Sequence, residues 1–161
     1  MKGSAMVEHY VKLFLYRIYD SGRSVDGVNA FLHAIRVADL LHDEEQWIVG
    51  ALHDVVEDGK ATFEELQTRF QLSEIQMNAL KMLTRNEGES YSCYISRVKR
   101  NALAVQVKLC DLKDNIQRCA NDLPGRLSLL KRYLRAYDEL YKKDFSRRLI
   151  QTTGGTNETG K

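Results

Sequence analysis

The sequence predicts an all-α protein, a single helical bundle of about eight helices. Apolar residues recur at steps of three and four along most of the chain, which is the period of a helix face packed on a core. One proline, Pro124, and ten glycines leave few of the turn signals that an all-β fold needs. The chain has 161 residues, 43% of them hydrophobic, which is enough to bury one core. We therefore expect one domain over residues 1–150 and a flexible tail over 151–161, where no apolar residue anchors the chain.

The expected helices follow from local signals along the chain. The first carries an apolar stripe from Val7 to Ile18, and a loop rich in glycine and serine follows it. In chain order, the later helices are expected over residues 28–41, 44–56, 62–70, 73–84, 90–99, 102–119 and 126–148. Gly59 is expected to end the third helix. The next two open on capping boxes, in which a hydroxyl residue precedes a glutamate or glutamine by three positions: Thr62 with Glu65, and Ser73 with Gln76.

Charge and cysteine content argue against several classes of partner. Lysines and arginines number 24 against 22 acidic residues, so a net charge of +2 gives no attraction to nucleic acid. No apolar run approaches the length of a membrane span, so no membrane association is expected. The three cysteines, Cys93, Cys110 and Cys119, lack CxxC spacing and are typical of free thiols in a reducing compartment. A cytoplasmic location follows as an expectation.

The most informative segment runs from Ala51 to Asp58 and reads ALHDVVED. His53 and Asp54 are adjacent, and on a helix Glu57 and Asp58 each lie one turn beyond one of them. This spacing places one imidazole and three carboxylates on a single patch. Carboxylates this close repel one another, and a bound cation would relieve that repulsion.

Two other segments offer residues that can complete a site. His33 lies among apolar residues of the second expected helix, where a single histidine is more often a hydrogen-bonded core residue than a ligand. Further along the chain, three residues form a polar stripe beside the apolar one: Lys108, Asp111 and Asn115. Each feature alone has a structural explanation. Their combination, an upstream histidine, HDxxED and a downstream DxxxN, favours a metal site.

This combination resembles the HD superfamily of metal-dependent phosphohydrolases. The closest resemblance is to the hydrolase domain of the RelA/SpoT enzymes, which removes pyrophosphate from guanosine 3′,5′-bis(diphosphate), ppGpp. Three blocks carry it, in the order of the family: HAIRVA at 33–38, ALHDVVED at 51–58 and VKLCDLKDN at 107–115. The resemblance implies that residues 1–150 form an HD domain that hydrolyses ppGpp to GDP and pyrophosphate.

The resemblance also implies a role for each matching residue. It assigns one divalent ion to four ligands, His33, His53, Asp54 and Asp111. Manganese is the usual occupant, and this donor set also suits Fe²⁺ and does not exclude Zn²⁺. Glu57 and Asp58 would orient the attacking water and take its proton. Contacts to the small phosphorylated nucleotide are assigned to five residues: Arg23, Asn115, Lys108, Lys113 and Arg118.

The chain departs from the family pattern before and after these motifs. Ala34 stands where the family favours proline, Leu112 where it favours arginine, and the loop from Arg23 to Asn29 lacks the usual proline and tyrosine. Two alternatives therefore stay open. One is an HD nucleotidase or pyrophosphohydrolase that acts on another nucleotide, and the other is a helical binding module without turnover.

Overall fold

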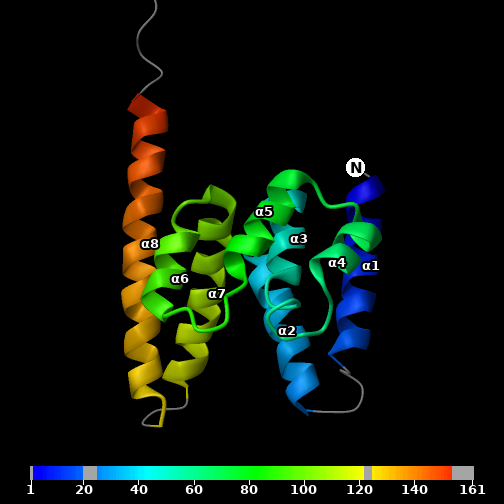
Figure 1. Cartoon of the computed structure of the whole chain (residues 1–161), viewed down its shortest axis with the longest axis horizontal. Helices are drawn as coiled ribbons and strands as arrows, with labels where there is room; N and C mark the ends of the chain where they lie inside the picture. Colours follow the sequence, from blue (N-terminus) through cyan, green and yellow to red (C-terminus); the bar gives the residue numbers. More distant parts are fainter. Residues whose placement is uncertain (1, 20–24, 122–124, 154–161) are drawn as a thin grey trace, which may run out of the picture.

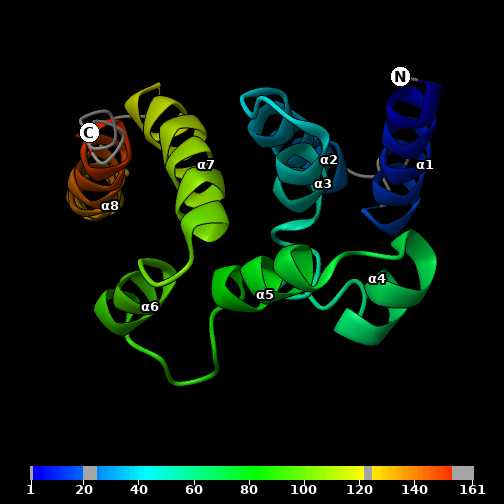
Figure 2. The ribbon, with the colours of Figure 1, turned by 90° about the horizontal axis from the view of Figure 1, so that it is seen from above.

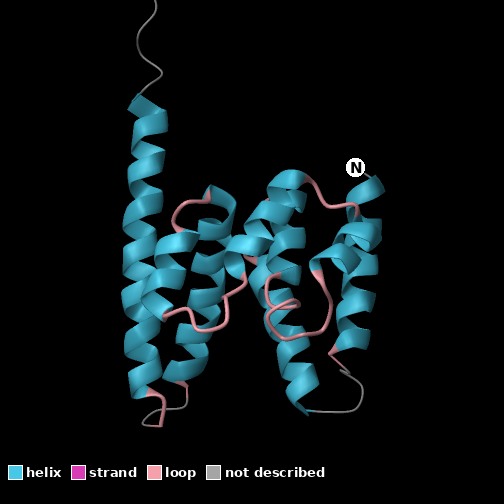
Figure 3. Ribbon diagram, in the orientation of Figure 1, coloured by secondary structure: helices cyan, strands magenta, loops and turns pink. Residues whose placement is uncertain are grey.

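The computed structural model describes residues 2–19, 25–121 and 125–153, and these form eight helices and no strand (Figures 1 and 3). The all-α prediction is therefore confirmed. The helices are α1 (Lys2–Ile18), α2 (Val25–Asp39), α3 (Glu44–Leu52), α4 (Phe63–Phe70), α5 (Glu74–Leu83), α6 (Tyr91–Val98), α7 (Ala102–Ala120) and α8 (Leu127–Thr153). None of the described helices combines the length and apolar character that crossing a membrane requires. The three cysteines are free.

The helices form two rows. Seen from above, α8, α7, α2 with α3, and α1 form one row, while α6, α5 and α4 lie along its side (Figure 2). Helix α7 packs against α2, α3, α5, α6 and α8, so it connects the two rows. Nearly every helix supplies a fully buried leucine to the core: Leu15, Leu52, Leu66, Leu80, Leu112 and Leu140.

Both predicted capping boxes are present. The Thr62 hydroxyl accepts a hydrogen bond from the Glu65 amide at 3.1 Å, and the Glu65 carboxylate accepts one from the Thr62 amide at 2.7 Å. Ser73 and Gln76 exchange the equivalent pair at the start of α5. These bonds satisfy amide groups that have no partner within the helix, which fixes where α4 and α5 begin.

A close approach between α2 and α3 sets the spacing of two candidate ligands. A Cβ atom at Gly50 would lie 2.5 Å from Leu41 Cδ1 and 3.1 Å from Ala38 Cα. Only glycine therefore allows this contact without a shift of the neighbours. The contact holds α3, which leads into His53, against α2, which carries His33.

The largest differences from the prediction are at two helix ends, while α2 is shifted from the predicted 28–41 to Val25–Asp39. Helix α3 ends at Leu52, whereas the sequence predicted helix to Val56. Tight turns follow it, with hydrogen bonds from the Val55 amide to Leu52 O and from the Gly59 amide to Val56 O, and Gly59 adopts a φ of 64°. Helix α8 runs past the predicted end to Thr153. Residues 151–153 thus continue the helix, the rest of the predicted tail lies outside the described residues, and the domain boundary at residue 150 stays a prediction.

Candidate metal centre

Three segments bring the four predicted metal ligands together. His33 lies on α2, His53 and Asp54 begin the turns after α3, and Asp111 lies on α7. The His33 Nε2 atom is 3.1 Å from Asp111 Oδ1 and 3.6 Å from Asp54 Oδ2. The His53 Nε2 atom is 3.1 Å from Asp54 Oδ2 and 3.6 Å from Asp111 Oδ1. Two imidazole nitrogens and two carboxylate oxygens thus converge on one point, and the ligand atoms of His33, His53 and Asp54 all lie within 4.8 Å of one another.

Hydrogen bonds to the far side of each ring direct the imidazoles into the centre. His53 Nδ1 donates to the Gly50 carbonyl oxygen at 2.7 Å, and His33 Nδ1 donates to Asp114 Oδ2 at 2.7 Å. Because each Nδ1 carries its proton, each Nε2 can present a lone pair to a cation. The buried His53 Nε2 has no hydrogen-bond partner among the described residues. An orphaned buried nitrogen beside two carboxylates fits a metal ligand.

The charge around the centre favours a cation. Burial lowers the pKa of His33, but hydrogen bonds to Asp111 and Asp54 outweigh burial and raise that pKa to about 9. Burial also opposes the charged form of His53, and the same two carboxylates raise its pKa well above the usual range. A metal ion that binds here must displace the imidazole protons, so its affinity rises with pH. The donor set, with nitrogen and oxygen ligands and no sulfur, suits Mn²⁺, Fe²⁺ or Zn²⁺.

Outside the ligands, Asp114 holds His33 in place. Its Oδ1 accepts a hydrogen bond from Arg36 Nε at 2.6 Å, and its Oδ2 accepts one from Arg36 Nη2 at 3.1 Å. Neither residue was predicted from the sequence, although each lies three positions after a predicted ligand: Arg36 after His33, and Asp114 after Asp111. On a helix, that spacing places the two side chains on neighbouring parts of one face, which is the signal that was available.

We expect Asp114→Ala to weaken Mn²⁺ binding by roughly 10–100-fold, because His33 loses the acceptor that fixes its tautomer and ring orientation. Isothermal titration of the metal-free protein with Mn²⁺ measures this. The matched control is Asp144→Ala, which also removes a buried carboxylate bound to an arginine, at 2.8 Å from Arg148, but lies between α7 and α8. Equal affinities for the two variants would contradict the role of Asp114.

A cavity of about 520 Å³ opens beside the centre. Its lining includes five of the predicted catalytic and substrate residues, Glu57, Asp58, Lys108, Asn115 and Arg118. Lys113 is exposed and does not line it, because two residues turn a helix by about 200° from Asp111. The assignment of Lys113 to the substrate therefore stays a prediction without support from the cavity lining. Arg23 lies outside the described residues.

The two predicted catalytic acids are fixed by different contacts. Asp58 remains one turn beyond Asp54, since its amide donates to Asp54 O at 2.8 Å. Its Oδ2 accepts a hydrogen bond from the Tyr19 hydroxyl at 3.0 Å. Glu57 Oε2 accepts one from the Arg85 amide at 2.9 Å, which ties it to the loop after α5. Both acids therefore face the cavity with one oxygen already engaged.

Two residues on the polar stripe of α7 contact Asp111. Lys108 Nζ lies 2.6 Å from Asp111 Oδ2 and 5.1 Å from the centre of the Tyr94 ring. Asn115 Nδ2 donates to Asp111 Oδ1 at 2.5 Å. Burial raises the pKa of Asp111, but Lys108 and the two histidines outweigh it, so that pKa lies well below the usual range. Asp111 is therefore ionised at neutral pH.

The lining of this cavity also includes residues that were not predicted from the sequence as site residues. They come from the end of the first helix segment, α2, the loop before α6, α6 itself, and the turn before α8 with its first turns: Tyr19, Asn29, Arg85, Tyr91, Tyr94, Arg126, Arg132 and Tyr133. Arg132 lies over the Tyr91 ring, 4.7 Å from its centre. No motif marks these positions, because they approach the centre only through the packing of α1, α2, α6 and α8 around α3 and α7.

A comparison with models of known protein families gives no match, and a comparison with curated protein sequences gives none either. The interpretation of the centre therefore depends on its geometry and its chemistry.

Proposed function

We propose that this chain is a metal-dependent phosphohydrolase of the HD type. The observation that carries the proposal is the convergence of His33, His53, Asp54 and Asp111, with the orphaned His53 Nε2 directed at both carboxylates. A divalent ion bound there would lower the pKa of a coordinated water and so supply hydroxide near neutral pH. A cavity of about 520 Å³ suits a small molecule rather than a nucleic acid.

The side chains around the centre provide the remaining groups for phosphoryl transfer to water. Asp58 is suited to take the proton of the attacking water, because Tyr19 holds one carboxylate oxygen and leaves the other available. Burial and the nearby Asp54 raise the pKa of Asp58 above its usual value, which makes it a stronger base. Glu57, held by the Arg85 amide, would orient the same water.

The charges of the cavity favour a substrate with several phosphates. Basic residues from three parts of the chain line it: Arg85, Lys108, Arg118, Arg126 and Arg132. Guanidinium groups pair well with phosphate oxygens, and tyrosines such as Tyr91 and Tyr133 offer faces on which a base can stack. Within this class we propose ppGpp as the substrate, with attack on the 3′-diphosphate and release of GDP and pyrophosphate in the cytoplasm.

The test is an assay of Mn²⁺-loaded protein with ppGpp and with a panel of 5′-nucleotides, with products separated by anion-exchange chromatography. We expect pyrophosphate and GDP from ppGpp. Asn115→Ala should raise KM more than it lowers kcat, because the amide would contribute uniform binding to the substrate. Gln117→Ala is the matched control, since Gln117 is an exposed amide of α7 outside the cavity.

The possible outcomes separate the alternatives. Hydrolysis of a 5′-monophosphate without release of pyrophosphate from ppGpp would rule out ppGpp as the substrate. The proposal of a metal-dependent phosphohydrolase would remain. Mn²⁺ binding without turnover of any nucleotide would identify a binding module instead.

A further inference from the structure

Helix α8 carries a second apolar stripe beside the one that packs on α7. Its members follow one another at steps of three and four: Leu127, Leu130, Leu134, Tyr137, Tyr141 and Phe145. The exposed fractions of Leu127, Leu134, Tyr141 and Phe145 are 48%, 48%, 52% and 52%. Spaced in this way, apolar side chains form the seam of a helix that pairs with another helix.

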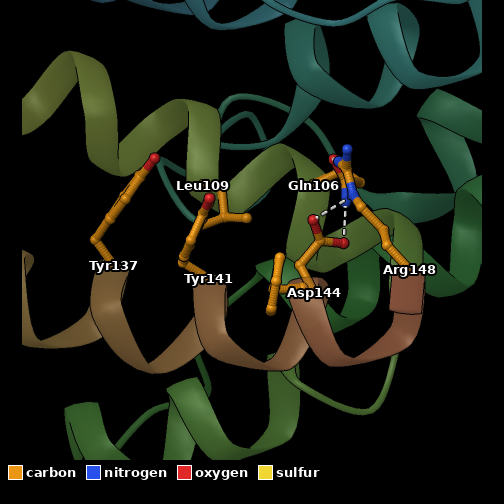
Figure 4. Close-up of a pocket in the computed structure, with 7 residues that line it drawn as sticks. Gln106, Leu109, Tyr137, Tyr141, Asp144 and Arg148 are labelled. Carbon is orange, nitrogen blue, oxygen red and sulfur yellow. Dashed lines mark hydrogen bonds and ion pairs between the residues drawn. The ribbon is translucent and has the colours of Figure 1, made fainter. Parts of the chain in front are cut away.

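The stripe borders a groove of about 460 Å³ between α7 and α8. Tyr137 and Tyr141 stand along α8 with their rings stacked, 6.1 Å apart and inclined by 11°, beside Leu109 of α7 (Figure 4). Asp144 closes one end of the groove through hydrogen bonds with Arg148 and Gln106. In Figure 2, α8 is the last helix of its row.

We infer that the partner of this stripe is α8 of a second copy, which packs against it in antiparallel fashion about a twofold axis. With the axis between Leu134 and Tyr137, Leu134 of one copy faces Tyr137 of the other, and Leu130 faces Tyr141. Every apolar position of the central stripe then has an apolar partner. Together with α7 of each copy, the two α8 helices form a four-helix arrangement.

Charges at the margin of the stripe select this orientation. Lys131 and Asp138 occupy the same edge of the stripe, seven residues apart. The Asp138 side chain is 63% exposed and binds Lys142 of its own helix through Oδ2 at 2.7 Å, which leaves Oδ1 for a second partner. Antiparallel pairing places Lys131 of each copy beside Asp138 of the other, which gives two symmetric ion pairs. Parallel pairing would place this edge of one copy against the opposite edge of the other, so that neither ion pair would form. The stripe runs from residue 127 to 145, about 27 Å of helix, which is long enough for a specific contact between two helices.

The test is the dissociation constant of the full chain, measured by sedimentation equilibrium. We expect a dimer that Leu134→Asp abolishes, while Ile75→Asp on α5, at a residue that is 61% exposed, leaves it unchanged. Circular dichroism establishes that each variant keeps its helices.

The charge variants test the orientation without altering the apolar stripe. Lys131→Glu and Asp138→Lys should each weaken the dimer by about tenfold, because two attractions become two repulsions. The double variant Lys131→Glu/Asp138→Lys should restore the original constant. A chain that stays monomeric at all concentrations overturns the inference, as does a dimer that Leu134→Asp leaves intact. Single charge variants without effect would overturn the antiparallel arrangement.

Discussion

Asp54→Ala and His53→Ala should each abolish both the binding of Mn²⁺ and the hydrolysis of the substrate. Each variant removes one of four converging ligands, and the remaining atoms cannot complete the coordination of the ion. Without the ion, no water of lowered pKa is generated at neutral pH, so turnover falls to the background rate. Metal content per chain after reconstitution and dialysis, together with kcat, measures the two effects.

The control for this prediction is His42→Ala. His42 is an exposed histidine between α2 and α3 and is not part of the centre, so its removal should change neither quantity. An Asp54→Ala protein that kept its full metal content and turnover would show that the four residues do not form the site. The comparison needs no knowledge of the substrate, since metal content alone decides whether the centre binds an ion.

Local sequence patterns account for most of the fold. The two capping boxes placed the starts of α4 and α5 because a capping box is formed by residues within one turn of each other. The apolar stripe of α7 was equally accessible: Val105 and Leu112 are fully buried. The polar stripe beside it, with Lys108 and Asn115, indeed lines the cavity. When one face of a helix packs on the core and the next faces a site, its sequence shows an apolar stripe and a polar stripe side by side.

The sequence did not reveal contacts that depend on tertiary packing. His33 and Asp114 are 81 positions apart, and nothing local to either residue indicates that they meet. The end of α3 at Leu52 also differs from the prediction. The sequence predicted helix to Val56, but the Val55 amide donates to Leu52 O, three residues back, so the chain continues in tight turns.

The HDVVED residues converge through their side chains. Adjacent residues on a helix point about 100° apart, and His53 keeps helical backbone angles, with φ −57° and ψ −34°. The His53 Nε2 and Asp54 Oδ2 atoms nevertheless lie 3.1 Å apart, and both face His33 or Asp111. The motif thus marks two of the converging residues, while the packing of α2 and α7 beside them supplies the other two.

Asp58→Asn should retain Mn²⁺ and lower kcat by roughly 10²–10⁴-fold, because the amide cannot take the proton of the attacking water. At Mn²⁺ concentrations that saturate the centre at every pH, wild-type kcat/KM should fall as pH drops through the pKa of Asp58, which burial and Asp54 raise. This acidic limb should be absent in Asp58→Asn. Tyr19→Phe tests the same base by a smaller change. The Tyr19 hydroxyl stabilises the charged Asp58 carboxylate and lowers its pKa, so its loss should move the acidic limb of kcat/KM to higher pH while metal content stays constant.

Glu57→Gln should also keep the metal and lose activity. The amide oxygen of glutamine can still accept a hydrogen bond from the Arg85 amide, but the negative charge is gone. Full kcat in Asp58→Asn with the metal bound would assign the proton to another group, and loss of the metal in that variant would make Asp58 a ligand.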